Sequence, residues 1–313
     1  MKFGVNIHSS SPFRPITAIE DYLKMAKKYE QDGLDSLWFA DHLIRTPDPQ
    51  KSDLFETWTL IAGLSIPTSK IRFGTLVTPI GFRNIGLFAK MVSTIDHLTN
   101  GRVNVGLGAG WYQREYDMFN IPFGTLKERF HLLEGYIKTL LALWKGEEYT
   151  HEESPRVSRG YLAPKPIQKP HPPILIGGGG EKRTLKLVAK YAQMSNFSAT
   201  NEGIKHKLSI LENHCAAVGR DFKEIEPTIT RALCCGKTPE EVDEIVKWYR
   251  NRLKELRGTA PSREDFSKDR FVGTPDQIIS QISEVRDLGV KHILFTINDE
   301  KSSELCGEII KEF

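Results

Sequence analysis

The feature that most constrains the fold is a repeated alternation of short apolar runs with segments of helical periodicity. An apolar run followed by an amphipathic segment is typical of a strand and its crossover helix. The alternation predicts eight strands, at residues 2–7, 34–40, 71–77, 102–107, 174–176, 193–197, 225–234 and 290–295. Helices are predicted over residues 19–29, 54–66, 85–98, 126–144, 184–191, 204–218, 239–256, 276–288 and 304–313.

Eight strands with intervening helices are the count of an α/β fold of the (β/α)8 TIM barrel type, in which right-handed crossovers close a parallel sheet. A doubly wound open sheet is the alternative. Chemically distinctive residues follow nearly every predicted strand, and barrel enzymes build their active sites at that rim. We therefore expect residues 1–313 to form one barrel domain.

Two segments interrupt the alternation. Residues 145–173, after the fourth helix, are polar and contain six prolines, and residues 257–270, before the eighth strand, are charged and rich in turn formers. Proline neither continues a helix nor fits a central strand, so we expect both segments to be insertions on the surface. Loops of this length often carry function, and we predict that they are lids or contacts within a homodimer.

Composition excludes several classes of protein. The net charge is only +3 and the basic residues are scattered, which does not favour nucleic-acid binding. No apolar run approaches the roughly 20 residues of a membrane span, and residues 1–7 lead directly into a strand rather than a targeting peptide. We expect a cytoplasmic protein. Its four cysteines lack CxxC spacing and its nine histidines lack an HExxH pair, so no metal site is expected.

Four consecutive glycines, Gly177, Gly178, Gly179 and Gly180, separate the fifth predicted strand from its helix. Such a loop can turn backbone N–H groups toward an anion, and the helix N-terminus adds partial positive charge. The stretch is not a P-loop, because Glu181 replaces the required glycine, and it is not a dinucleotide-binding GxGxxG sequence. We interpret it as a phosphate-binding loop, with a flexible turn as the alternative.

The other predicted strand ends carry a mixed set of polar groups. In chain order they are Asn6 and His8, Asp41 and His42, Thr78 and Pro79, residues 108–111, Ser195 and Asn196, Arg231, and residues 296–298. The set lacks a serine or cysteine nucleophile with a supporting base, and it lacks the lysine or paired carboxylates of an aldolase or isomerase. A cofactor that brings its own chemistry suits these residues better.

Several motifs together resemble the luciferase-like superfamily of flavin and deazaflavin oxidoreductases. They lie at residues 37–42, 73–79, 82–84, 101–103, 106–111, 129–130, 142–144, 177–180 and 272–277, and thus span nearly the whole chain. Residues 55–60, 178–185 and 214–222 are similar to a branch of probable coenzyme F420-dependent oxidoreductases. The superfamily fold is a (β/α)8 barrel, in agreement with the strand count.

The resemblance implies a set of cofactor contacts. The four glycines and Arg183 would hold a phosphate tail, and Asp41 with His42 would lie beside the ring. Thr75, Leu76 and Val77 would form a bulge with a cis Leu76–Val77 peptide behind the ring. The remaining cofactor contacts are assigned to Gly108, Ala109 and Gly110, where backbone can approach closely, and to Asn6 and Asn196, which bind ring carbonyls or pair strand ends.

The implied reaction is hydride transfer between coenzyme F420 and an unidentified small organic substrate. The protein must then bury the ring and supply or remove a proton. We predict that His42 is the acid or base, with Asp41 orienting it or binding the ring. A purely structural hydrogen bond is the alternative for His42. Glu56 is predicted either to face substrate or to stabilise a helix N-terminus.

Other functions remain open on the sequence alone. Relatives with a catalytic acid after the fourth strand carry a glutamate where this chain has Trp111, so the proton donor is not fixed. Trp111 and Trp58 could be packing residues or walls of a substrate pocket. An FMN-dependent monooxygenase or flavin reductase of the same fold is the first alternative function. A non-catalytic flavin-binding protein is the second, which a complete barrel with Asp41 and His42 disfavours.

Overall fold

A computed structural model describes the chain except for residues 8–12, 14–15 and 46–52. Eight parallel strands form a closed ring in the order β1-β2-β3-β5-β8-β9-β10-β12, and β12 pairs with β1. These strands are β1 (Lys2–Ile7), β2 (Ser36–Phe39), β3 (Arg72–Thr75), β5 (Val103–Gly108), β8 (Ile174–Gly177), β9 (Met194–Phe197), β10 (Glu226–Cys235) and β12 (His292–Thr296). The predicted (β/α)8 barrel is confirmed.

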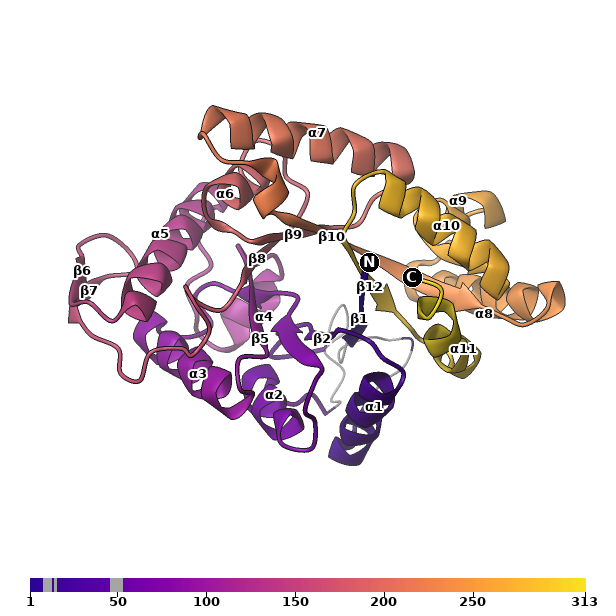
Figure 1. The fold of residues 1–313 in the computed structure, drawn as a ribbon, viewed down its shortest axis with the longest axis horizontal. Coiled ribbons are helices and arrows are strands. Elements are labelled where there is room, and N and C mark those ends of the chain that lie inside the picture. The colour runs from indigo at the N-terminus through magenta and orange to yellow at the C-terminus, as the bar shows by residue number, and fades with distance from the viewer. Residues whose placement is uncertain (8–12, 14–15, 46–52) are drawn as a thin grey trace.

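Helices surround the barrel (Figure 1). They are α1 (Ile19–Gln31), α2 (Thr57–Ser65), α3 (Ile85–Leu98), α4 (Gln113–Met118), α5 (Leu126–Lys145), α6 (Thr184–Tyr191), α7 (Asn201–Ala217), α8 (Pro239–Arg257), α9 (Arg263–Ser267), α10 (Pro275–Asp287) and α11 (Glu300–Ile310), with a 3-10 turn η1 (Phe222–Glu224). The bounds of α3 and α6 are those that the sequence predicts. No helix among the described residues is long and apolar enough to cross a membrane.

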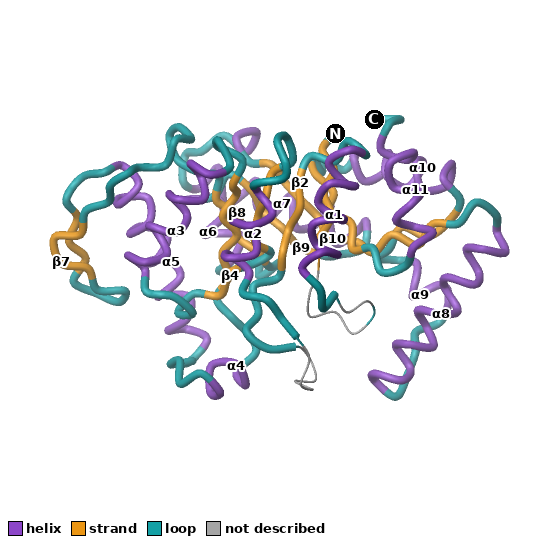
Figure 2. Tube along the Cα trace, turned by 90° about the horizontal axis from the view of Figure 1, so that it is seen from below, coloured by secondary structure: helices purple, strands orange, loops and turns teal. Residues whose placement is uncertain are grey.

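Both insertions contain structure that the sequence did not predict. Residues 145–173 include an antiparallel hairpin of β6 (Tyr149–His151) and β7 (Val157–Gly160). The region before β12 adds α9 and the short strand β11 (Phe271–Gly273), which pairs with the end of β10. Figure 2 shows α4 and the end of α8 projecting beyond the barrel on the side opposite the chain termini. Because α4 follows β5 and α8 follows β10, this is the side on which the strands end.

Apolar side chains fill the space inside the ring as well as the layer beneath the helices. Trp38, Leu175, Met194 and Leu294 form a buried cluster with Leu76 and Val77 packed against it. A Cβ atom at Gly74 would lie 2.5 Å from the Trp38 ring, so that glycine makes room for the indole. The barrel is thus a packed core whose usable surface is its rim.

The third strand is interrupted where the family resemblance implies a bulge. β3 ends at Thr75, the Leu76–Val77 peptide bond is cis, and pairing resumes in β4 (Thr78–Pro79), which joins β5. The predicted position of the cis bond is confirmed. The interruption places Thr75, Val77 and Thr78 at the rim between β2 and β5.

Candidate functional site

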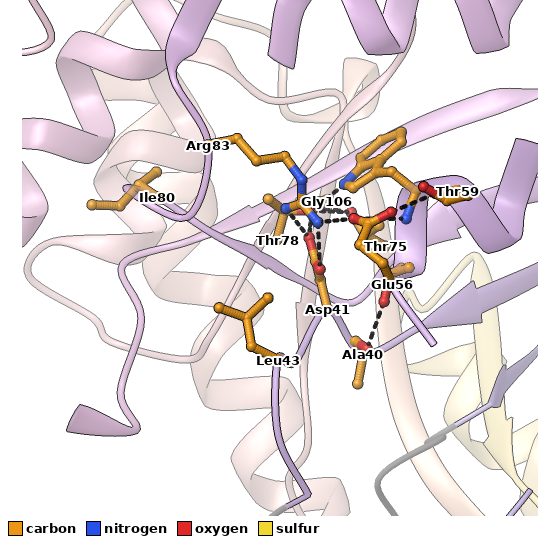
Figure 3. Close-up of polar contacts among 12 residues, drawn as sticks. Ala40, Asp41, Leu43, Glu56, Thr59, Thr75, Thr78, Ile80, Arg83 and Gly106 are labelled. Carbon is orange, nitrogen blue, oxygen red and sulfur yellow. Dashed lines mark hydrogen bonds and ion pairs between the residues drawn. The ribbon is translucent and has the colours of Figure 1, made fainter. Parts of the chain in front are cut away.

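A buried ion pair joins the segments that follow β2 and β4 (Figure 3). Asp41 is 1% exposed, and its Oδ2 atom accepts hydrogen bonds of 2.7 Å from both Thr78 Oγ1 and Arg83 Nη1. Its Oδ1 atom accepts a bond of 3.0 Å from Arg83 Nη2. A bidentate guanidinium–carboxylate pair fixes both partners in direction as well as distance. The charge of Asp41 is therefore balanced within the chain.

Glu56 is the N-cap of α2 and also contacts the Arg83 guanidinium. Its carboxylate accepts hydrogen bonds from the backbone N–H groups of Trp58 (3.3 Å) and Thr59 (2.7 Å). Burial alone would raise the pKa of Glu56, but the bonds from Thr59 and Arg83 outweigh burial and lower that pKa. The helix-capping interpretation is confirmed, and it explains why α2 begins at Thr57 rather than residue 54. A contact with substrate stays a prediction.

His42 is held by Glu115, not by Asp41. The Nδ1 atom of His42 lies 2.9 and 3.0 Å from the two carboxylate oxygens of Glu115, which is 1% exposed on α4. Glu115 Oε1 also accepts bonds from the backbone N–H groups of Leu43 (3.0 Å) and Ile44 (3.2 Å). The expectation that Asp41 orients His42 is therefore wrong, because both Asp41 oxygens are bound to Arg83 instead.

The two tryptophans near the site differ in exposure. Trp58 is fully buried and donates a 2.9 Å hydrogen bond from Nε1 to Thr78 Oγ1, so it is a packing residue. Trp111 is 66% exposed, and its ring meets that of His42 edge-on with the centroids 6.1 Å apart. Of these two candidates for a pocket wall, Trp111 alone has an aromatic surface beside the imidazole that solvent can reach.

Glycines of two neighbouring strands accommodate the Val77 side chain. A Cβ at Gly108 would lie 2.5 Å from Val77 Cγ2, and one at Gly177 would lie 2.7 Å from Val77 Cγ1. Thr75 donates a 2.9 Å hydrogen bond from Oγ1 to the Gly106 carbonyl. The side-chain space at Gly108 and Gly177 is therefore taken by Val77, and their predicted cofactor contact could involve only backbone. Ala109 and Gly110 follow β5 directly.

The glycine-rich loop follows β8 and leads into α6, as the sequence predicts. Gly178 has a φ of +114°, which favours glycine, and its N–H donates to the Asn196 carbonyl at 2.8 Å. Lys207 of α7 donates from Nζ to the Gly179 carbonyl at 2.7 Å, and a Cβ at Gly179 would lie 2.9 Å from the lysine stem. A cation is thus packed on the loop, which suits an anionic ligand.

Two other predicted residues lie beside this loop. Arg183 occupies the N-cap position of α6, and its guanidinium lies over the Phe130 ring, 5.6 Å from the centroid. Gly180 precedes the first turn of α6, where the Leu185 N–H donates to the Gly180 carbonyl at 3.0 Å. The structure therefore adds to this loop Lys207, a residue that the sequence did not single out and that contacts Gly179, whereas the Arg183 guanidinium packs on Phe130.

The two asparagines differ in how their side chains are used. Asn196 donates from Nδ2 to Thr228 Oγ1 at 2.7 Å and accepts from Thr230 Oγ1 at 3.1 Å, so it pairs β9 with β10. Asn6 on β1 is 8% exposed, and among the described residues its Oδ1 atom has no hydrogen-bond partner. A buried acceptor without a partner is costly unless a ligand donor completes it. His8 lies outside the described residues.

Comparison with known proteins identifies the family of this chain. The model of a family described as luciferase-like monooxygenase matches residues 1–292. The chain belongs to this family. Family members are oxidoreductases, so the luciferase-like assignment makes the rim of the barrel a candidate redox site.

Two relatives of this luciferase-like protein show the range of the similarity. An uncharacterized protein of Mycobacterium tuberculosis is 33% identical over 177 residues, which cover 56% of this chain and 61% of that protein. An FMNH2-dependent dimethylsulfone monooxygenase of Pseudomonas putida is 27% identical over 305 residues, which cover 87% of this chain and 81% of the monooxygenase. The first match thus spans less than two thirds of either chain.

A solved structure supports the fold of the luciferase-like chain. The coenzyme F420-dependent tetrahydromethanopterin reductase from Methanopyrus kandleri superposes with a TM-score of 0.81 at 18% identity, covering 100% of this chain and 99% of the reductase.

Among the described residues, no group of three or more His, Cys, Asp or Glu side chains is arranged to bind a metal.

Proposed function

We propose that this luciferase-like protein transfers a hydride between coenzyme F420 and a small organic substrate. The observation that carries the proposal is the His42–Glu115 pair at the rim, with His42 Nδ1 held by a buried carboxylate. Hydride transfer that interconverts a carbonyl and an alcohol is completed by one proton, and an imidazole is the side chain suited to move it near neutral pH.

The residues present fit a deazaflavin with an anionic tail. When bound, the deazaflavin accepts or donates the hydride. The Oδ1 atom of Asn6, which has no hydrogen-bond partner among the residues that the structure describes, is a buried acceptor suited to a ring N–H group. The loop of Gly178, Gly179 and Gly180, with Lys207 packed on it, is suited to a phosphate. In this proposal these residues bind the cofactor and His42 handles the proton.

The Asp41–Arg83 pair has a supporting part in this proposal. Asp41 precedes His42 in the chain, and its carboxylate is fixed to Thr78 and Arg83, whereas His42 is held by Glu115. Adjacent residues anchored to different neighbours leave the backbone between them little freedom. We therefore assign Asp41 to holding the loop that presents His42.

The proposal is tested by titrating the purified protein separately with F420 and with FMN. Binding is followed through the absorbance and fluorescence of each cofactor, and F420 reduction is then assayed with a panel of small alcohols. Saturable F420 binding and substrate-dependent reduction are expected. A tight FMN complex with no measurable affinity for F420 would overturn the choice of cofactor.

A second candidate is an FMN-dependent monooxygenase or flavin reductase. It is favoured by the similarity to the dimethylsulfone monooxygenase, which extends over most of both chains. The glycine loop does not distinguish the two cofactors, because both carry a phosphate. Supplying reduced FMN and measuring oxygen uptake with and without candidate substrates separates this function from hydride transfer to or from F420.

A further inference from the structure

We propose that Glu115 is a positioning residue that sets the tautomer of His42, with the proton on Nδ1 and the lone pair on Nε2. An ionised carboxylate only accepts hydrogen bonds. Because both Glu115 oxygens lie within 3.0 Å of Nδ1, that nitrogen must be the donor. A neutral imidazole has one N–H group, so Nε2 is the atom that takes up or releases a proton. This inference rests on the proposed function for its role in a reaction.

The carboxylate is itself held in a defined orientation. The backbone N–H groups of Leu43 and Ile44 both donate to Glu115 Oε1, so the backbone distinguishes this oxygen from Oε2. The neighbouring Tyr116 is buried and donates from its hydroxyl to the Ile80 carbonyl at 3.0 Å, which anchors α4 beside β4. Glu115 therefore connects α4 to the loop of His42 through three donors.

The arrangement gives His42 a charge partner during proton transfer. When an alcohol is oxidised, its C–H bond gives up a hydride to the cofactor, its hydroxyl proton passes to Nε2, and a carbonyl forms. The resulting imidazolium carries its positive charge beside the Glu115 carboxylate, 2.9 Å from Nδ1. In the opposite direction Nε2–H returns the proton to the carbonyl oxygen. Fixing a catalytic histidine through its second nitrogen is an established way to control its tautomer.

A purely structural role for Glu115 is the competing explanation, since the carboxylate also caps the Leu43 and Ile44 N–H groups. The Glu115→Gln substitution separates the two roles. The amide oxygen would stay on these two backbone donors, which places the amide NH2 where Oε2 now faces Nδ1. Nδ1 would then face this NH2 donor as well as the amide oxygen at the Oε1 position, 2.9 Å away, so the preference for a proton on Nδ1 is weakened and the population protonated on Nε2 increases while the backbone bonds persist.

The deciding experiment is nitrogen NMR of the histidine rings in cofactor-free protein labelled with 15N-histidine. His42 is assigned by its loss in a His42→Asn variant. The native protein at a pH where His42 is neutral is expected to show a protonated Nδ1, and Glu115→Gln a larger fraction protonated on Nε2. A native His42 protonated on Nε2, or a tautomer unchanged in Glu115→Gln, overturns the inference. The native spectrum alone decides the point if the variant does not fold.

Kinetics then connect the tautomer to turnover. Glu115→Gln is expected to lower kcat for F420 reduction by about 10²- to 10⁴-fold, the usual contribution of proton transfer, with little change in KM for F420. Glu153→Gln is the matched control, because Glu153 pairs with His131 at 3.1 Å on the exposed surface. An unchanged kcat in Glu115→Gln contradicts the inference. A native protein that does not bind F420 contradicts the proposed function and leaves the NMR result to decide the tautomer.

Discussion

Arg83 closes a bidentate ion pair on Asp41, with hydrogen bonds of 2.7 and 3.0 Å to a carboxylate that is almost fully buried. Burial alone would lower the pKa of Arg83, but Asp41 and Glu56 outweigh burial and raise it. The guanidinium therefore stays charged between two carboxylates. This pair couples the ends of β2 and β4 and so supports the loop that carries His42.

Removing the cation should destabilise the fold strongly. In Arg83→Met, Asp41 remains as a buried carboxylate without its partner, and breaking one side of a buried pair costs about 3 to 5 kcal/mol. The free energy of unfolding from urea titrations measures the loss. Adding Asp41→Asn should recover part of it, because the unpaired charge is then absent. Arg159→Met is the control, since its pair with Glu148 is exposed and should contribute less than about 1 kcal/mol.

Glu226 should make stability depend on pH in the acidic range. Burial by itself raises the pKa of Glu226, but His292, at 2.9 Å, and Lys2 outweigh burial and lower that pKa to about 2. A glutamate in the unfolded state has a pKa of about 4.3. Between this pH and about 2, the folded state therefore binds fewer protons than the unfolded state. The stabilisation is therefore complete above about pH 4.3 and is lost as the pH falls toward 2.

The measurement is the free energy of unfolding at several pH values between about 6 and 2.5. The native protein should lose stability steeply below about pH 4.5, and Glu226→Gln should show a smaller slope, because residue 226 no longer titrates. Glu20→Gln is a suitable control, since Glu20 is exposed in the first turn of α1. An identical slope in native protein and Glu226→Gln would show that other carboxyl groups cause the acid sensitivity.

The barrel could be predicted from the sequence because every strand and crossover helix carries its own periodic pattern. The bounds of α3 were correct, since Asn84 caps one end and a left-handed Asn100 follows the other. The sequence placed α2 three residues too early, because it did not indicate that the Glu56 side chain caps the helix rather than extending it. Local signals thus fix where elements lie better than where they begin.

The candidate site was predicted only in part. His42 was identified from its place after a strand, but its partner Glu115 is 73 positions away, on a helix of six residues that is too short for a periodic pattern. The one available signal was that Glu115, like Trp111, lies in the segment that follows the fourth predicted strand. The adjacency of Asp41 and His42 was misleading, because the two side chains contact different elements. Such long-range pairings depend on the folded geometry.

Replacing a glycine by alanine should change the stability of the protein in opposite directions at two positions. A Cβ at Gly106 would lie 1.7 Å from the Thr75 carbonyl oxygen, which is backbone and cannot turn aside. Gly106→Ala should therefore destabilise the protein by at least about 1 to 3 kcal/mol. Gly63→Ala, in α2 with open space around its Cβ, should stabilise it by about 0.5 to 1 kcal/mol. Thermal unfolding measures both, and a tolerated Gly106→Ala would contradict the close packing of β5 on Thr75.

The cation on the glycine loop should contribute to cofactor binding. Lys207 Nζ lies 2.7 Å from the Gly179 carbonyl, so its charge is next to the proposed phosphate position, where it also pairs with Glu181 at 3.7 Å. Lys207→Met should weaken the binding of both F420 and FMN about tenfold, or about 1.4 kcal/mol, because both carry a phosphate. Lys205→Met is the matched control, as an exposed lysine on the same helix. Fluorescence titration gives the dissociation constants. Equal affinities in native protein and Lys207→Met would move the phosphate away from this loop, whereas a loss for only one cofactor would show that the two tails bind differently.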